Sequence, residues 1–315
     1  MNVNPLDLLG SMPGAVSQGL IWGIMAIGVY ITYKILDVAD LTVDGSFCTG
    51  GAVCVMLMMA GCNVWVALLC AFLAGLLTGM ATGFFHTFCG IPAILAGILT
   101  QLGLWSVNLA IMGKANQSIS VNNYDLLVSL RYLQEVLKGD RPFWQSPILV
   151  VGLFVVVIIA LLYWFFGTEQ GCSLRATGAN LNMARAQGIN TNFNKVLGLM
   201  LSNGLVALAG ALLAQYQGFS DINMGRGAIV IGLAAVIIGD VLFSRIFRNF
   251  ALRLLGVAIG AIVYYVVIQV VLWLGLDSNY LKLLSALVVA VFLAMPYWKG
   301  KYFSKRVKRG GKAHA

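Results

Sequence analysis

Long apolar runs separated by short polar segments follow one another along almost the whole chain. Because a helix rises about 1.5 Å per residue, about 20 apolar residues cross a hydrocarbon core of about 30 Å. The runs predict spans near residues 15–35, 45–60, 64–85, 91–112, 147–166, 196–215, 228–243, 254–274 and 281–296. The second and seventh are short, which is typical of broken or tilted segments. We therefore predict an all-α membrane protein, a polytopic helical bundle of about nine spans, with eight to ten as the range.

The sequence also contains an internal match at a fixed offset of 181 residues. Residues 40–43 align with residues 221–224, and Gly51, Gly75 and Gly79 each align with a glycine at the same offset. The predicted topology orients the two copies, about 36–112 and about 217–298, in opposite directions. Inverted repeats with a path at their interface are typical of transporters. The alternative is chance similarity among glycine-rich membrane helices. In either case residues 1–315 are predicted to form one transmembrane domain.

Glycines recur at every fourth position in two of the predicted spans. One series is Gly75, Gly79 and Gly83, and the other is Gly256 and Gly260. In lipid there is no hydrophobic force between helices, so small residues that allow close backbone approach supply much of the packing. These faces predict a tightly packed bundle and say nothing of a substrate.

Composition excludes a soluble protein, because 60% of the residues are apolar and only 10% are charged. The net charge of +9 is concentrated near the end of the chain. Seven basic residues crowd the tail 299–315: Lys299, Lys301, Lys305, Arg306, Lys308, Arg309 and Lys312. A basic run can bind nucleic acid, but beside a membrane span it more often marks the cytoplasmic side. We predict a cytoplasmic C-terminus, no nucleic-acid partner, an external loop 114–146 and a cytoplasmic loop 167–194.

Residues that could carry out chemistry inside the spans are few. No span has an acidic or histidine relay at its centre, since Asp44 and Asp240 are predicted near membrane edges. An ion-coupled transporter usually needs such groups. No Gly-Lys pair has the surroundings of a phosphate-binding loop, so any ATP must be bound by another protein. Six scattered cysteines and two histidines predict neither a disulfide set nor a metal site, and we expect no cofactor in this chain.

The polar stretch 175–190 has the pattern of a short helix within the cytoplasmic loop. Asn180 and Asn182 are suited to cap the start of such a helix, and Gly188 is suited to end it. Apolar Met183 and Ala186 would give the helix one face for a partner. The plain alternative is a surface helix that only connects two spans.

This stretch and the span after it resemble the permeases of the branched-chain amino acid and ribose type of ABC importer. The loop matches at Arg175, Ala176, Gly178, Asn180, Ala184, Gly188, Ile189 and Asn190, and the span matches at Ser202, Ala209, Gly210 and Ala214. Residues 39–46 depart from the pattern of many relatives and are similar to the uncharacterised, tryptophan-type branch. That similarity implies an amino acid, of the aromatic class, as the substrate.

The resemblance implies a homodimeric or pseudo-dimeric permease in the cytoplasmic membrane. A cytosolic ABC ATPase would bind ATP and drive it, and an extracytoplasmic binding protein or lipoprotein would deliver the solute. The residues implied to couple to the ATPase are Gly178, Asn180, Asn182, Ala184, Arg185 and Gly188. The polar residues proposed for the substrate path are Thr42, Asp44, Ser46, Gln101, Ser202 and Asn203. Two alternatives stay open. One is a stand-alone secondary transporter or channel. The other is a membrane enzyme or scaffold, against which the sequence offers no paired acids and no nucleophile–base pair.

Overall fold

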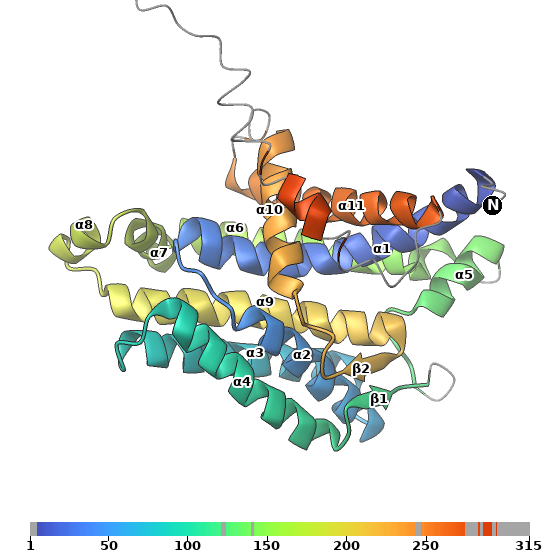
Figure 1. Cartoon of the computed structure of the whole chain (residues 1–315), viewed down its shortest axis with the longest axis horizontal. Coiled ribbons are helices and arrows are strands. Elements are labelled where there is room, and N and C mark those ends of the chain that lie inside the picture. Colours follow the sequence, from blue (N-terminus) through green and yellow to red (C-terminus); the bar gives the residue numbers. More distant parts are fainter. Residues whose placement is uncertain are drawn as a thin grey trace, which may run out of the picture.

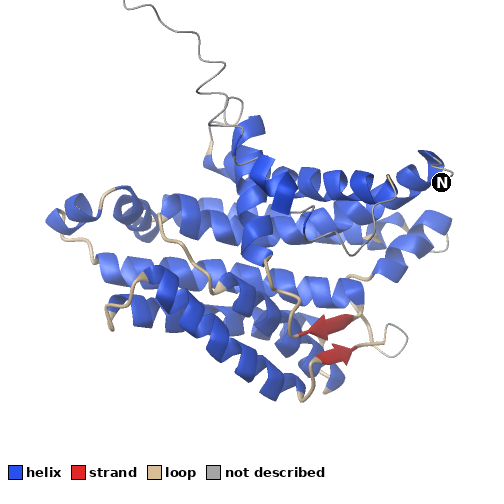
Figure 2. Cartoon of the chain, in the orientation of Figure 1, coloured by secondary structure: helices blue, strands red, loops and turns tan. Residues whose placement is uncertain are grey.

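The structure, a computed structural model, describes residues 5–120, 124–139, 142–243, 247, 249–274, 283, 286–291 and 294. The predicted basic tail 299–315 lies outside these residues, as does most of the predicted ninth span 281–296. The described chain is almost entirely helical (Figure 2). The predicted all-α membrane class is therefore confirmed in its coarse form, while the number of nine spans stays a prediction.

Six helices of the described chain are long and apolar enough to cross a membrane. They are α1 (Pro5–Tyr30) with its continuation η1 (Ile31–Ile35), α3 (Val64–Thr87), α4 (Ala93–Met112), α6 (Pro147–Gly167), α9 (Thr191–Gln217) and α11 (Phe250–Trp273). The two runs predicted to be short form the shorter apolar helices α2 (Val43–Met59) and α10 (Ala228–Phe243). Length and hydropathy thus located these eight segments, and their ends agree to within several residues except at the start of α1, which begins at Pro5 and not near residue 15.

The outer helices carry large apolar side chains on their exposed surfaces. On α6, Leu153, Leu161 and Trp164 are exposed, and on α3, Leu69 and Leu77 are exposed. A helix that is apolar on its outer as well as its inner face is typical of a protein surrounded by lipid.

Helix α9 lies at the centre of the bundle and packs against α1, α2 and α3. The predicted glycine face of α3 is confirmed, because a Cβ at Gly75 or Gly79 would overlap the backbone of α9. A Cβ at Gly50 of α2 would overlap Ala207, and one at Gly210 would overlap Phe47. The helix backbones therefore touch, and only glycine fits at these crossings.

The arrangement of the two halves supports the repeat hypothesis, which stays a prediction. Helices α1 and α9, which correspond at the offset of 181 residues, run in opposite directions (Figure 1). α3 packs on α9, and its counterpart α11 packs on α1. The aligned residues Asp40 and Asp221 also make the same local contact, because each accepts a hydrogen bond from the backbone N–H two residues on.

The two long loops hold structure of their own. The loop 114–146 contains the strand β1 (Asn116–Ser118), the helix α5 (Leu130–Lys138) and the short turn η2 (Phe143–Gln145). β1 pairs antiparallel with β2 (Phe219–Asp221), with Asn116 opposite Asp221. The loop 167–194 contains α7 (Glu169–Ala179) and α8 (Leu181–Ala186), at the opposite end of the molecule from α5 (Figure 1).

Candidate functional site

A turn between α1 and α2 places a carboxylate inside the bundle. Asp40 is 3% exposed, and its Oδ1 accepts a hydrogen bond of 2.9 Å from the backbone N–H of Thr42. This side-chain turn ends the connecting segment, and α2 begins at the next residue, Val43.

Asn203 of α9 joins this turn to the neighbouring helices. Its Nδ2 donates to Asp40 Oδ2 at 2.7 Å and to the Leu199 carbonyl at 2.9 Å. Its Oδ1 accepts from Ser46 Oγ at 2.6 Å, and Ser46 Oγ lies 2.8 Å from Thr78 Oγ1. The Asn203 side chain therefore has a partner for both ends of its amide, and it is fully buried.

Three threonines continue the network across α2, α3 and α4. Thr42 Oγ1 and Thr82 Oγ1 are 2.7 Å apart, and Thr82 Oγ1 donates to Thr100 Oγ1 at 2.9 Å. We call the buried set the polar cluster: Asp40, Thr42, Ser46, Thr78, Thr82, Thr100 and Asn203. Because every member has hydrogen-bond partners and none is more than 6% exposed, the cluster is a structural joint between four helices rather than an open passage.

The predicted path residues are thus divided between different places. Thr42, Ser46 and Asn203 come together in the polar cluster. Ser202, also fully buried, points to the other side of α9 and donates to the Gly28 carbonyl of α1 at 2.7 Å. Asp44 and Gln101 lie instead at a separate cavity.

This cavity, which we call the α2–α4 cavity, has a volume of about 200 Å³. It lies between α2, α4 and the segment 222–229. Its lining combines charged, amide and aromatic side chains: Asp44, Gly45, Cys48, Gln101, Leu102, Trp105, Asn108, Ile222 and Arg226. Trp105 and Arg226 are both exposed, so the cavity opens on the surface of the single chain.

Asp44 holds the segment 222–229 against α2. Its Oδ2 accepts from the Gly227 N–H and its Oδ1 from the Ile229 N–H, each at 3.0 Å. A carboxylate at this position satisfies free N–H groups at the start of α10 and compensates the positive end of the helix dipole. Cys48 adds a second attachment, because its Sγ accepts from the Gly225 N–H at 3.1 Å.

Asn108 of α4 is an unusual group in the cavity wall. It is 1% exposed, and its Oδ1 is a buried acceptor without a hydrogen-bond partner. Its Nδ2 makes only a long contact of 3.4 Å with the Gly45 carbonyl. Buried acceptors without partners are uncommon and costly, so this oxygen is available to a donor that enters the cavity.

The second candidate region is the α7–α8 segment. Asn180 caps α8 as predicted, since its Oδ1 accepts from the backbone N–H groups of Asn182 and Met183 at 3.0 and 3.1 Å. Gly188, with a φ of +76°, ends the helical turn as predicted. The prediction that Asn182 also caps is wrong: it lies inside the first turn of α8, and its N–H is one of the groups capped.

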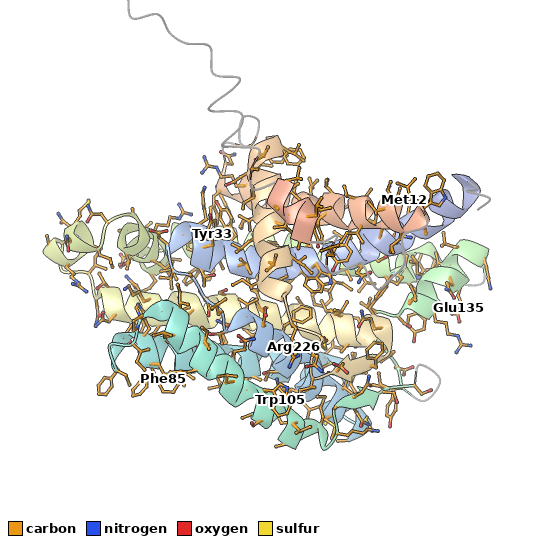
Figure 3. The ribbon with its side chains drawn as sticks, viewed as in Figure 1. Met12, Tyr33, Phe85, Trp105, Glu135 and Arg226 are labelled. Carbon is orange, nitrogen blue, oxygen red and sulfur yellow. The ribbon has the colours of Figure 1, made fainter. Side chains whose placement is uncertain are left out.

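α8 projects from the bundle at the end reached by Tyr33 and Phe85 (Figure 3). Met183 is 61% exposed, and Asn182 and Arg185 are exposed beside it. Arg185 Nε donates to Thr191 Oγ1 at 3.1 Å, which connects α8 to the first turn of α9. Ala184 is buried, so it supports α8 from within and offers no surface to a partner.

α7 is fixed tightly against two of the long helices. A Cβ at Gly178 would overlap the carbonyl of Ile35, at the end of η1. Asn194 Nδ2 of α9 donates to Thr177 Oγ1 of α7 at 3.0 Å. Gly178 is therefore a close-packing residue against the end of η1, and the neighbouring Thr177 connects α7 to α9.

Asp44 was expected near a membrane edge, but it lies inside the bundle and lines the α2–α4 cavity together with Arg226. Figure 3 shows Arg226 near the middle of the long dimension of the molecule. The cause is the short α2, which begins halfway along the bundle and faces the start of α10. Four members of the cluster, Asp40, Thr78, Thr82 and Thr100, were also not predicted from the sequence, because only tertiary contacts bring them together.

The described residues contain no group of three or more His, Cys, Asp or Glu side chains that could hold a metal ion.

Comparison with known proteins finds one family along nearly the whole chain. Residues 12–295 match the family described as branched-chain amino acid transport system, permease component. The chain is 40% identical over 286 residues to a tyrosine transport system permease protein of Clostridioides difficile, which covers 90% of this chain and 91% of the relative. It is 25% identical over 316 residues to a fructose import permease protein of Bifidobacterium longum, covering 98% and 83% of the two chains.

A solved structure shares the fold. It is PsaBC from Streptococcus pneumoniae in complex with a Fab, with a TM-score of 0.54 and 16% sequence identity. The match covers 95% of this chain and 99% of the other. At this identity the likeness concerns the fold alone.

Proposed function

This chain belongs to the branched-chain amino acid permease family and is a membrane subunit of an ABC importer, and we propose that two copies of it form the path for an amino acid. The α2–α4 cavity carries this proposal. At the middle of the bundle it exposes the Arg226 guanidinium and part of the Asp44 carboxylate. Charges at such a depth are costly in lipid, so they face protein or a watery path. A second copy facing this surface would enclose such a path.

The cavity lining suits a zwitterion with an apolar side chain. Arg226 can bind a carboxylate through two N–H groups, and the free lone pairs of Asp44 and Asn108 can accept from an ammonium group. Trp105 offers an aromatic face to the side chain. The tyrosine permease relative supports an aromatic amino acid as the first substrate to test.

Energy would enter at α8. A cytosolic ATPase would dock on the exposed surface of α8 and move it when two ATPase subunits close on ATP. The ATPase subunits would bind the ATP, and this chain would need no cofactor. The Arg185–Thr191 and Asn194–Thr177 contacts would pass this movement to α9, and the hydrogen bond between Asn203 and Ser46 would pass it to α2. α2 carries Asp44, so the same movement would reopen the cavity toward the other side of the membrane.

The remaining partners follow from this arrangement. The protein would lie in the cytoplasmic membrane with α8 and the C-terminal tail in the cytoplasm. An extracytoplasmic binding protein would dock at the opposite end, where α5 and the β1–β2 pair lie (Figure 1). In the described residues, the end with α8 carries Lys34, Arg175, Arg185, Lys195 and Arg253, which agrees with the preference of cytoplasmic loops for basic residues.

The test is transport in proteoliposomes that contain this chain and its co-expressed ATPase, with the binding protein supplied on the external side. We expect labelled tyrosine to accumulate only when ATP is available to the ATPase. Arg226→Gln and Asp44→Asn should each lower the rate by about tenfold, equivalent to about 1.4 kcal/mol. Arg309→Gln in the tail 299–315 and Asp37→Asn at an exposed position outside the cavity lining make the same charge changes and should leave uptake unchanged.

The outcomes separate the alternatives. Uptake by the chain alone, driven by an ion gradient without the ATPase, would establish a secondary transporter. If both cavity variants take up substrate with ATP at the wild-type rate, the α2–α4 cavity is not part of the path, but the importer function still holds.

A further inference from the structure

A second polar cavity lies at the end of the bundle that carries α8. It has a volume of about 450 Å³ and lies between the end of α1, α7 and the first turn of α11. Its lining is Tyr30, Lys34, Ile35, Arg175, Gly178, Ala179, Phe250 and Arg253. We call it the basic cavity, because this lining has three cationic side chains and no carboxylate. It shares no residue with the α2–α4 cavity or with α8.

The positive charge in the basic cavity is only partly compensated. Lys34 Nζ lies 3.1 Å from Asp240 Oδ2, so this cation is paired with a carboxylate outside the lining. Among the residues that the structure describes, neither Arg175 nor Arg253 forms an ion pair with an acidic side chain. Two guanidinium groups from different elements, α7 and α11, therefore face one cavity without a described carboxylate ion-paired to either.

Aromatic side chains hold the guanidinium of Arg175 in place. Its central carbon lies 4.5 Å from the ring centre of Phe250 and 5.2 Å from that of Phe166. Stacking on aromatic rings fixes the plane of a guanidinium group while its N–H donors stay free at the edge. This long side chain is thus already ordered before a ligand binds, so binding costs less conformational entropy.

The cavity lies where two long apolar helices reach their ends. The apolar segment that contains α1 ends at Ile35, and α11 begins at Phe250. Both residues line the cavity and give it an apolar wall beside its cationic groups. Such a combination at the end of membrane helices suits a phosphate group carried at the level of lipid headgroups.

We propose that the basic cavity binds a phosphate-bearing anion through the guanidinium groups of Arg175 and Arg253. The anion is held by charge-assisted hydrogen bonds between α7 and α11, with the buried Tyr30 hydroxyl at the cavity wall. Gly178 and Ala179 line the same cavity and come directly before Asn180, the cap of α8. An occupant therefore ties the segment that carries α8 to the membrane helices.

The experiment uses the full purified chain in a neutral detergent, with two probes. In the first arm, equal amounts of phosphatidylglycerol and phosphatidylcholine are added, and native mass spectrometry measures the lipid retained. In the second arm, inorganic phosphate is titrated without lipid, and thermal unfolding reports binding. The variants are Arg175→Gln, Arg253→Gln and the two combined, with Lys114→Gln plus Arg131→Gln as the charge-matched control near α5.

We expect wild type to retain phosphatidylglycerol selectively. Each arginine substitution should weaken retention about fivefold, from about 1 kcal/mol per basic residue near an anionic lipid surface. Arg175→Lys should recover part of the loss, because it keeps the charge but not the fork of donors. Loss of phosphatidylglycerol in the variants identifies a lipid headgroup, whereas loss of saturable stabilisation by inorganic phosphate identifies a free phosphate.

Two results would overturn the proposal. One is that wild type shows neither selective lipid retention nor saturable phosphate binding. The other is that the control near α5 loses as much binding as the cavity variants, since that would reflect net charge alone. Neither result bears on ATP-driven uptake, so the proposed importer function would remain untouched.

Discussion

Asparagine side chains have different roles in the polar cluster and in α8. In the polar cluster, Asn203 is fully buried, and its amide bonds to Asp40, Ser46 and the Leu199 carbonyl. In α8, Asn180 caps the helix with its side chain, while Asn182, two residues on, is exposed. Burial and contacts, and not residue type, separate a group that holds helices together from one that offers a surface to a partner.

The two regions should therefore respond differently to substitution. The polar cluster and the glycine crossings around it decide whether the bundle assembles, because their contacts join α2, α3, α4 and α9. α8 has few contacts with the bundle, so a substitution there should spare the fold and affect only what binds to it. The predictions below run from the largest expected cost in stability to the smallest.

Gly210→Leu should have the largest effect. A Cβ at this position overlaps the backbone of Phe47, so α2 and α9 would have to separate. We expect a cost above about 5 kcal/mol, which reaches the lower end of the stability of folded proteins. Size-exclusion chromatography in detergent should show no folded protein. Gly103→Leu on α4 is the control, because nothing lies within 4 Å of its Cβ position, and it should leave the elution profile unchanged.

Asn203→Leu should destabilise the bundle by about 3 kcal/mol, because it leaves Asp40 buried without one of its partners. Asp40→Asn should cost less, about 1 kcal/mol, since a neutral amide can still accept from the Thr42 N–H. Thermal unfolding in detergent measures both. Equal losses in the two variants would show that the buried carboxylate is not what Asn203 stabilises.

Arg185→Glu should cost no more than about 1 kcal/mol, the value of its one hydrogen bond to Thr191. Membrane insertion and the melting temperature should stay close to wild type, whereas ATP-driven uptake should be lost. Arg309→Glu in the tail 299–315 is the charge-matched control and should transport normally. Normal uptake by Arg185→Glu would show that this residue of α8 does not couple the ATPase to transport, and would contradict the functional difference between α8 and the polar cluster.

Local signals in the sequence were sufficient for α8 and for most of the helices. The cap at Asn180, the positive φ of Gly188 and the apolar runs are properties of short stretches of chain, and each appears where it was predicted. The strands β1 and β2 were not predicted, because two segments of three residues pair only after the helices around them have packed.

Local signals in the sequence could not predict how deep in the bundle the acidic residues lie. Hydropathy alone placed Asp44 near a membrane edge, and this was one argument against an ion-coupled transporter. α2 instead begins within the bundle, so both Asp40 and Asp44 lie inside it. The importer assignment therefore rests on family membership and not on a lack of buried acids.

The docking of the ATPase on α8 can be tested directly by photo-crosslinking. A photoreactive amino acid placed at Met183, which is 61% exposed, is compared with one at Trp144, which is 74% exposed and lies just before α6. Both are irradiated in membranes that contain the co-expressed ATPase. We predict a crosslink to the ATPase from position 183 and none from position 144. No crosslink from position 183, or equal crosslinking from both positions, would contradict the account.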